Sequence, residues 1–139
     1  MPANTSATTR GTILVVDDEP MVVRAVSQIL LRAGFTVVAA TNPDEAVASF
    51  TEKEGAFDLL LTDVVMPGGG GRRLAERLAG RSPSLRVLFM SGFTDHESVR
   101  DDRALPWPLL VKPFTSAKLL EAVVDSLGGQ DVEVGQGGI

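Results

Sequence analysis

The chain has 139 residues, of which 44% are hydrophobic, and its formal net charge at pH 7 is -5. This length and composition suit one domain with one hydrophobic core. The lack of cysteine excludes disulfides, thiolate metal sites and cysteine nucleophiles, and the acidic balance argues against nucleic-acid binding. No signal peptide or run of about 18 apolar residues is found, so we expect a cytoplasmic protein without membrane contact.

Five short apolar runs alternate with segments of helical period, a pattern typical of βα units wound into a parallel sheet. The runs are rich in aliphatic and β-branched residues with little alternation, as expected of strands that helices cover on both faces. They are residues 12–16, 36–40, 58–62, 86–90 and 108–111. The sequence therefore predicts a doubly wound α/β domain with a five-stranded parallel sheet.

Apolar residues at helical spacing predict four helices, at about residues 21–33, 43–53, 72–79 and 116–127. Asn42 is a plausible N-cap for the second helix, and Gly34 and Gly128 offer left-handed stops for the first and the last. A further segment, 96–104, has little apolar period, and the prolines of "LPWP" prevent its continuation as a helix.

The domain is expected to cover residues 11–127. Residues 1–10 are predicted to be a polar N-terminal tail, and residues 128–139 a flexible C-terminal tail or a severed linker.

Reactive side chains stand at the ends of four of the five predicted strands. Right-handed crossovers bring the carboxyl ends of parallel strands to one edge of the sheet, so we expect these side chains to lie together. They are Asp17, Asp18, Asp63, Ser91 and Lys112. Taken alone, the first two aspartates would be read as turn or capping residues, but their convergence with a third carboxylate and a lysine favours a functional site.

Three carboxylates at one edge repel one another, by roughly 3 kcal/mol for a pair about 5 Å apart at an effective dielectric constant of about 20. Lys112 neutralises only one charge, so a proton or a cation is expected among them. Mg²⁺ fits best, because it accepts a few carboxylates and completes its shell with water or phosphoryl oxygens. A metal, a lysine and a hydroxyl around a carboxylate are the parts needed for phosphoryl transfer, which makes Asp63 a candidate nucleophile.

The motifs "ILVVDDEP", "DLLLTDVVMPG", "VLFMSG" and "LLVKPF" occur in this order at the strand ends. Over residues 11–127 the chain resembles the receiver domains of two-component response regulators. The resemblance implies a flavodoxin-like sheet of order 2-1-3-4-5 and a signalling domain rather than an enzyme. The segment "LPWPLLVKPF" is similar to receivers that are attached to hybrid histidine kinases.

The resemblance also implies the phosphoacceptor and its metal site. Asp63 would accept a phosphoryl group from the phosphohistidine of a histidine kinase or a histidine phosphotransfer domain. Asp17, Asp18, Asp63 and the main-chain carbonyl of Val65 would hold Mg²⁺.

Further roles are implied for the last two strands. Lys112 would pair with the phosphoryl oxygens, ahead of a cis bond to Pro113. Ser91 would move to hydrogen-bond the phosphorylated form, and Gly92 would leave the approach to Asp63 open.

The chain departs from the family at Leu109, where many members have a tyrosine or phenylalanine that turns inward during switching. Trp107 could take the place of this aromatic residue only if its proline-flanked loop lets the side chain reach the same position. Val65 and Phe93 would flank the phosphoryl group, and neither can orient an attacking water, which predicts slow hydrolysis of the phosphorylated form.

Three further features are assigned structural roles. The "GGGG" run is read as a flexible turn, because no lysine and serine or threonine follow it as in a phosphate-binding loop. His96 is read as a loop residue. Arg73, Arg77 and Arg81 recur every four residues, as on a solvated helix face, with a docking surface as the alternative.

Two other functions remain open from the sequence. A phosphatase of the haloacid dehalogenase type also has a nucleophilic aspartate after a strand, but it wants a second aspartate where Val65 stands here. The other alternative is a receiver-like interaction module that is never phosphorylated.

Overall fold

The computed structural model describes residues 10–66, 70–92 and 107–128. Five parallel strands form one sheet in the order β2-β1-β3-β4-β5, which confirms the predicted flavodoxin-like arrangement. The strands are β1 (Thr12–Val16), β2 (Thr36–Ala40), β3 (Leu59–Asp63), β4 (Arg86–Ser91) and β5 (Leu109–Val111). Asp63, predicted to follow the third strand, is its last residue.

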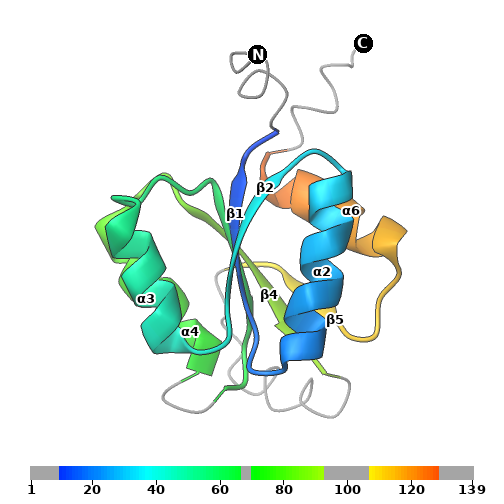
Figure 1. Ribbon diagram of the computed structural model, residues 1–139, viewed down its shortest axis with the longest axis horizontal. Helices are drawn as coiled ribbons and strands as arrows, with labels where there is room; N and C mark the ends of the chain where they lie inside the picture. The colour runs from blue at the N-terminus through cyan, green and yellow to red at the C-terminus, as the bar shows by residue number, and fades with distance from the viewer. Residues whose placement is uncertain (1–9, 67–69, 93–106, 129–139) are drawn as a thin grey trace.

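Helices cover both faces of the sheet, as expected of a doubly wound fold (Figure 1). Helices α3 and α4 lie over one face, and α2 and α6 over the other. Their bounds are α2 (Pro20–Arg32), α3 (Pro43–Glu52), α4 (Gly70–Arg81) and α6 (Ser116–Ser126). No helix within the described ranges is both long and apolar enough to cross a bilayer.

The helix ends follow from local sequence. The Asn42 side chain accepts a hydrogen bond from the Glu45 amide at 2.8 Å and caps α3, as predicted. Thr115 caps α6 in the same way. Gly34 and Gly128 follow α2 and α6 with φ of 101° and 99°, a left-handed conformation that glycine adopts without steric cost.

The hydrophobic core has two layers because alternate residues of each strand face opposite sides of the sheet. On β1, Leu14 and Val16 pack toward α3 and α4, whereas Ile13 and Val15 pack toward α2 and α6. All four are fully buried. The central strands are therefore the most enclosed part of the domain, and their carboxyl ends are fixed by packing on both sides.

Several sequence-based expectations lie outside the described residues. These are the tails, for residues 1–9 and 129–139, the weak helical segment 96–104 with His96, and Phe93.

Candidate functional site

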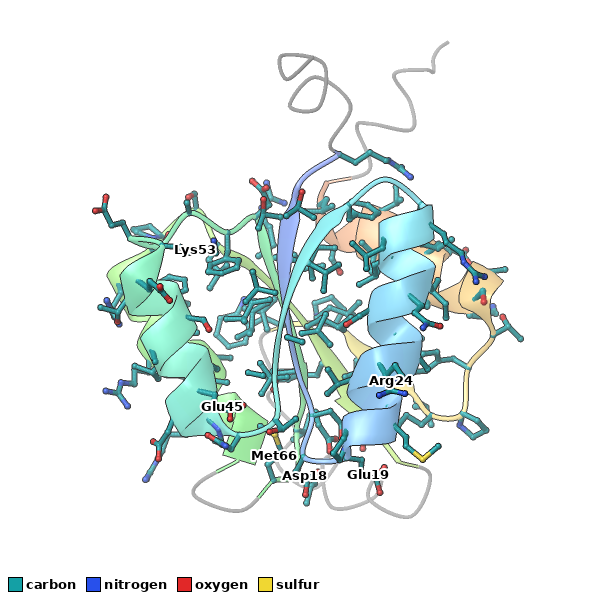
Figure 2. All side chains as sticks on the ribbon, in the orientation of Figure 1. Asp18, Glu19, Arg24, Glu45, Lys53 and Met66 are labelled. Carbon is teal, nitrogen blue, oxygen red and sulfur yellow. The ribbon has the colours of Figure 1, made fainter. Side chains whose placement is uncertain are left out.

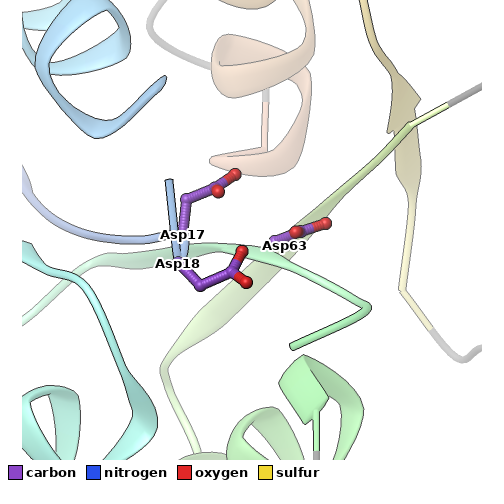
Figure 3. A group of neighbouring side chains, drawn as sticks. All are labelled: Asp17, Asp18 and Asp63. Atoms are coloured by element: carbon purple, nitrogen blue, oxygen red, sulfur yellow. The ribbon is translucent and has the colours of Figure 1, made fainter. Parts of the chain in front are cut away.

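Three aspartates meet at the carboxyl edge of the sheet (Figure 3). Asp17 and Asp18 directly follow β1, and Asp63 ends the neighbouring strand β3. One carboxylate oxygen from each lies within 4.8 Å of the other two. Figure 2 places Asp18, Glu19 and Met66 at this edge, whereas Lys53 lies at the opposite end of the domain. The sequence-based convergence of the three carboxylates is therefore present in the structure.

Asp17 is fixed from two directions. Its Oδ1 accepts a hydrogen bond from the Glu19 amide at 2.9 Å, within the turn that leads into α2. Its Oδ2 accepts a second hydrogen bond, also 2.9 Å, from Nζ of Lys112. Asp17 is fully buried, so these two donors replace the water that its charge loses. The Glu19 amide was not identified from the sequence, although aspartate side chains in turns commonly accept a hydrogen bond from the backbone amide two residues ahead.

Lys112 contacts two of the three aspartates. Its Nζ is 2.9 Å from Asp17 and 3.8 Å from Asp63. Burial alone would lower the pKa of Lys112, but the hydrogen bond with Asp17 and the charge of Asp63 outweigh it and raise the pKa above its ordinary value. The lysine therefore stays protonated and forms a direct ion pair with Asp17. A cis peptide bond joins Lys112 to Pro113, as the family resemblance implies.

Asp63 is the carboxylate without full compensation. Its residue is 5% exposed, and its Oδ1 is buried without a hydrogen-bond partner among the described residues. Burial and, less strongly, the charge of Asp17 raise the pKa of Asp63 to about 6, while Lys112 and a backbone hydrogen bond from Val65 oppose the shift. This carboxylate thus has one oxygen without a partner among the described residues, and it takes up a proton at a higher pH than an ordinary aspartate does.

The balance of charges differs from the sequence-based argument, which rested on repulsion between carboxylates. Burial is the largest cause of the raised pKa of Asp63. The charges of Asp17 and Asp18 raise the pKa as well, and Lys112, 3.8 Å away, offsets part of their effect.

Ser91 ends β4 beside the same edge and is fully buried. Its hydroxyl donates to the carbonyl oxygen of Gly92 at 3.3 Å, and its own carbonyl accepts from the Lys112 amide at 2.7 Å. The backbone thus places Ser91 and Lys112 on adjacent strand ends, as the sequence predicts. Gly92 is partly exposed and offers no side chain at this position.

The proposed switch position is apolar and half-buried. Leu109, the first residue of β5, packs against the core layer under α3 and α4. Trp107 reaches the same layer, where its ring contacts Phe89 edge-to-face with centroids 5.9 Å apart. Trp107 therefore packs against β4, the strand that ends in Ser91.

Two residues of the glycine run belong to a helix, which corrects the sequence-based reading of the run as a turn. Gly70 and Gly71 begin α4, two residues earlier than predicted, while residues 68 and 69 lie outside the described ranges. The Gly71 amide donates to the Val64 carbonyl at 2.7 Å, and a Cβ on Gly71 would overlap the carbonyl oxygen of Asp63. A Cβ on Gly70, whose φ is 78°, would lie 2.8 Å from the Val64 carbonyl. These glycines let the start of α4 pack directly on the strand end that carries Asp63.

The donor set is suited to a small hard cation. Three carboxylates converge, and one buried oxygen among them has no partner in the described part of the chain; oxygen ligands of this kind are preferred by Mg²⁺. Val65, two residues after the end of β3, is 46% exposed.

Comparison with known proteins gives a consistent family. The sequence matches the response regulator receiver domain family over residues 13–124. The sensor kinase CckA of Brucella abortus (strain 2308) is 32% identical over 122 residues, which are 87% of this chain but 13% of that protein. The response regulator receiver protein CpdR of the same organism is 33% identical over 110 residues, covering 75% of this chain and 90% of that protein.

The fold is also similar to solved structures. A chain of the CheX–CheY–BeF3–Mg²⁺ complex from Borrelia burgdorferi superposes with a TM-score of 0.72 at 25% identity, covering 86% of this chain and 91% of that chain. The match covers most of the sequence, and the parallel sheet brings the acidic pair, the aspartate of β3, the serine and the lysine to one edge. The chain belongs to the response regulator receiver domain family of two-component signalling.

Proposed function

We propose that this domain takes a phosphoryl group from the phosphohistidine of a histidine kinase or a histidine phosphotransfer domain onto Asp63, and that the modification changes its conformation. The observation that carries the proposal is the buried Oδ1 of Asp63, which has no hydrogen-bond partner among the described residues, beside a protonated Lys112. Burial raises the pKa of Asp63 to about 6, so at neutral pH most of this carboxylate is ionised and available as a nucleophile.

The transfer conserves atoms and charge. A carboxylate oxygen of Asp63 forms a bond to phosphorus, and the bond between phosphorus and the donor imidazole nitrogen breaks. The electron pair of that bond stays on the imidazole, which takes up a proton from solvent. Lys112, 3.8 Å from the Asp63 carboxylate, is placed to stabilise negative charge on the phosphoryl oxygens.

We infer that Asp17, Asp18, Asp63 and the main-chain carbonyl of Val65 hold Mg²⁺. The convergence of the three carboxylates and the free oxygen of Asp63 support this assignment. When bound, Mg²⁺ supplies positive charge that offsets the carboxylates and the phosphoryl oxygens. The similar Borrelia burgdorferi complex contains Mg²⁺ and BeF3, which is consistent with such a site.

The readout is assigned to the last two strands. Ser91 would donate its hydroxyl to the phosphoryl group in place of its present bond to the Gly92 carbonyl. Gly92 would leave the approach clear. Leu109 and Trp107, which pack in the layer beside Phe89, would then adjust to the movement of β4 and β5.

The partners and location follow from the same proposal. A histidine kinase or a histidine phosphotransfer domain is the phosphoryl donor, and the domain is located in the cytoplasm. The similarity to the sensor kinase CckA is consistent with a receiver of the hybrid kinase type. Residues 11–127 would be the receiver itself, flanked by tails or linkers.

Mass spectrometry after treatment with acetyl phosphate and Mg²⁺ tests the proposal. We expect the wild type to gain one phosphoryl group as a labile acyl phosphate, and to gain none in the presence of a chelator. Asp63→Asn should gain none. Asp44→Asn, which removes an exposed carboxylate from α3, is the matched control and should behave as the wild type.

Other outcomes would identify the alternative functions. Turnover of many phosphomonoesters by the wild type would indicate a phosphatase. Lack of any acyl phosphate in the wild type would indicate an interaction module, and an undiminished acyl phosphate in Asp63→Asn would show that another residue is the acceptor.

A further inference from the structure

Four arginines lie on α4, and they fall into two pairs. Arg72 forms an ion pair with Glu76 at 3.4 Å. Arg81 donates to the Thr51 hydroxyl at 3.0 Å and lies 5.2 Å over the ring of Phe50 on α3. These two arginines are therefore engaged within the domain.

The other two arginines, Arg73 and Arg77, are exposed and form no ion pair, hydrogen bond or ring contact with any residue in the described ranges. The chain as a whole has 18 acidic and 13 basic residues, so partners of opposite charge are not scarce. Residues four apart on a helix lie on the same face, about 6 Å from each other. The pair thus presents two guanidinium groups side by side to solvent.

A small pocket of about 110 Å³ opens between these two arginines and α3. Val47 and the largely buried Leu74 contribute apolar lining, and Pro43 and the carboxylate-bearing Asp44 line the pocket from α3. An apolar recess flanked by two exposed guanidinium groups is complementary to an apolar side chain flanked by carboxylates. The small volume limits the apolar group to one side chain of modest size.

We infer that Arg73, Arg77 and the Val47–Leu74 recess form a docking surface for an acidic amphipathic segment of a protein partner. One aliphatic side chain of that segment occupies the recess, and two carboxylates bind the arginines. The inference goes beyond the proposed phosphotransfer function, since the surface lies on the α3–α4 side of the domain and includes none of the residues assigned to the phosphorylation site.

The position of α4 gives the surface a defined relation to the site. The helix begins at Gly70, and the Gly71 amide donates to the carbonyl of Val64, the residue after Asp63. A partner on the first turns of α4 therefore binds a helix whose start is packed on the phosphoacceptor strand.

An NMR titration of the full chain without Mg²⁺ or phosphodonor tests the inference. The probe is a helical peptide with the pattern Glu-x-x-Leu-Glu, which places the leucine and both carboxylates on one face. We expect it to shift the methyl signals of Val47 and Leu74. Peptides with Gln in place of Glu, or Ala in place of Leu, should bind more weakly.

Charge-reversal variants give the matched comparison. Arg73→Glu and Arg77→Glu should each weaken peptide binding about tenfold. Arg24→Glu, an exposed arginine on α2 at the other face of the sheet, changes the net charge equally and should leave binding unchanged (Figure 2). All are surface positions. Thermal melts of the glutamate variants, and of Arg73→Gln and Arg77→Gln beside them, check that any loss of binding is not a loss of folding.

Three results would overturn the inference. They are an equal loss of binding in Arg24→Glu, no shift of the Val47 and Leu74 methyls at saturating peptide, and displacement of the peptide by inorganic phosphate at equal concentration, which would indicate a simple anion site. None involves the phosphoacceptor, so failure here would leave the proposed phosphotransfer function standing.

Discussion

Replacing Asp63 by asparagine is expected to stabilise the metal-free protein at pH 7.5. The folded-state pKa of Asp63 is about 6, against an ordinary value of 3.8. The folded protein therefore binds this proton more tightly than the unfolded chain does. The contribution of the group favours folding below pH 3.8 and is lost as pH rises through about 6, so the ionised carboxylate destabilises the fold at neutral pH.

The magnitude follows from the same numbers. The difference between about 6 and 3.8 is about 2.2 pKa units, and at 1.36 kcal/mol for each unit the penalty is about 3 kcal/mol. Asparagine has nearly the same shape without the charge, and the attraction to Lys112 that it gives up is already included in the pKa of about 6. We therefore expect a net gain in the free energy of unfolding of about 1 to 3 kcal/mol.

Urea denaturation of both proteins at pH 7.5 and pH 5, with chelator and with Mg²⁺, measures this gain. It should shrink at pH 5, where the wild-type carboxylate is largely protonated. It should also shrink with Mg²⁺, because ion at about a hundred times its Kd stabilises a binding fold by about 2.7 kcal/mol and the variant lacks one ligand. Equal midpoints for the two proteins in chelator at pH 7.5, or a gain that is the same at both pH values, would refute the reasoning.

Three further predictions concern the surroundings of Asp63. Gly71→Ala should destabilise the fold by about 3 kcal/mol or more in urea denaturation, because its Cβ overlaps a strand carbonyl. Gly80→Ala, with no atom within 4 Å of the new Cβ, should instead stabilise α4 by about 0.5 to 1 kcal/mol, and a similar response at both glycines would contradict the steric argument. Val65→Asn should speed loss of the acyl phosphate, since a polar group there can orient water, and mass-spectrometric decay that is slower in the variant would count against this. Lys112→Ala leaves the buried carboxylate of Asp17 unpaired and should lower the thermal midpoint by an amount equivalent to about 3 to 5 kcal/mol, whereas an unchanged midpoint would show that the ion pair is unimportant.

The fold could be predicted because its signals are local and repeated. Runs of apolar residues marked the five strands within one or two residues of their observed bounds, and the cap at Asn42 marked the start of α3. Parallel strands joined by right-handed crossovers then place all carboxyl ends at one edge. This rule alone was enough to bring Asp17, Asp18 and Asp63 together.

The start of α4 could not be predicted from local signals. Glycine has a low helix propensity, so the run before Arg72 indicated a turn. The helix nevertheless begins at Gly70. Gly71 packs against the carbonyl of Asp63, and this close approach requires glycine because it leaves no room for a side chain. That requirement depends on an approach between two segments, and no property of the run itself reveals it.

The ion pair between Lys112 and Asp17 could not be predicted from the sequence either. Lys112 and Asp17 are separated by 95 positions, and strand-end rules say only that both reach the same edge. The lysine forms its short contact with Asp17 and a longer one with Asp63 because the Glu19 turn fixes Asp17 in place. As a result, Asp17 has the shorter ion pair with Lys112, and Asp63 keeps one oxygen without a partner among the described residues.

The unequal burial of the strands indicates which part of the site can move. Asp17 and Asp63 stand at the ends of β1 and β3, whose apolar residues are fully buried between two core layers. Lys112 follows β5, an edge strand of three residues that are all only half-buried. Close-packed interiors resist deformation, whereas an edge strand with fewer contacts opens at a lower free-energy cost. A change of charge at Asp63 should therefore be accommodated by displacement of Lys112 and β5 rather than of the aspartates. Trp107 leads into β5 and contacts Phe89, so the same displacement should change the packing of its ring.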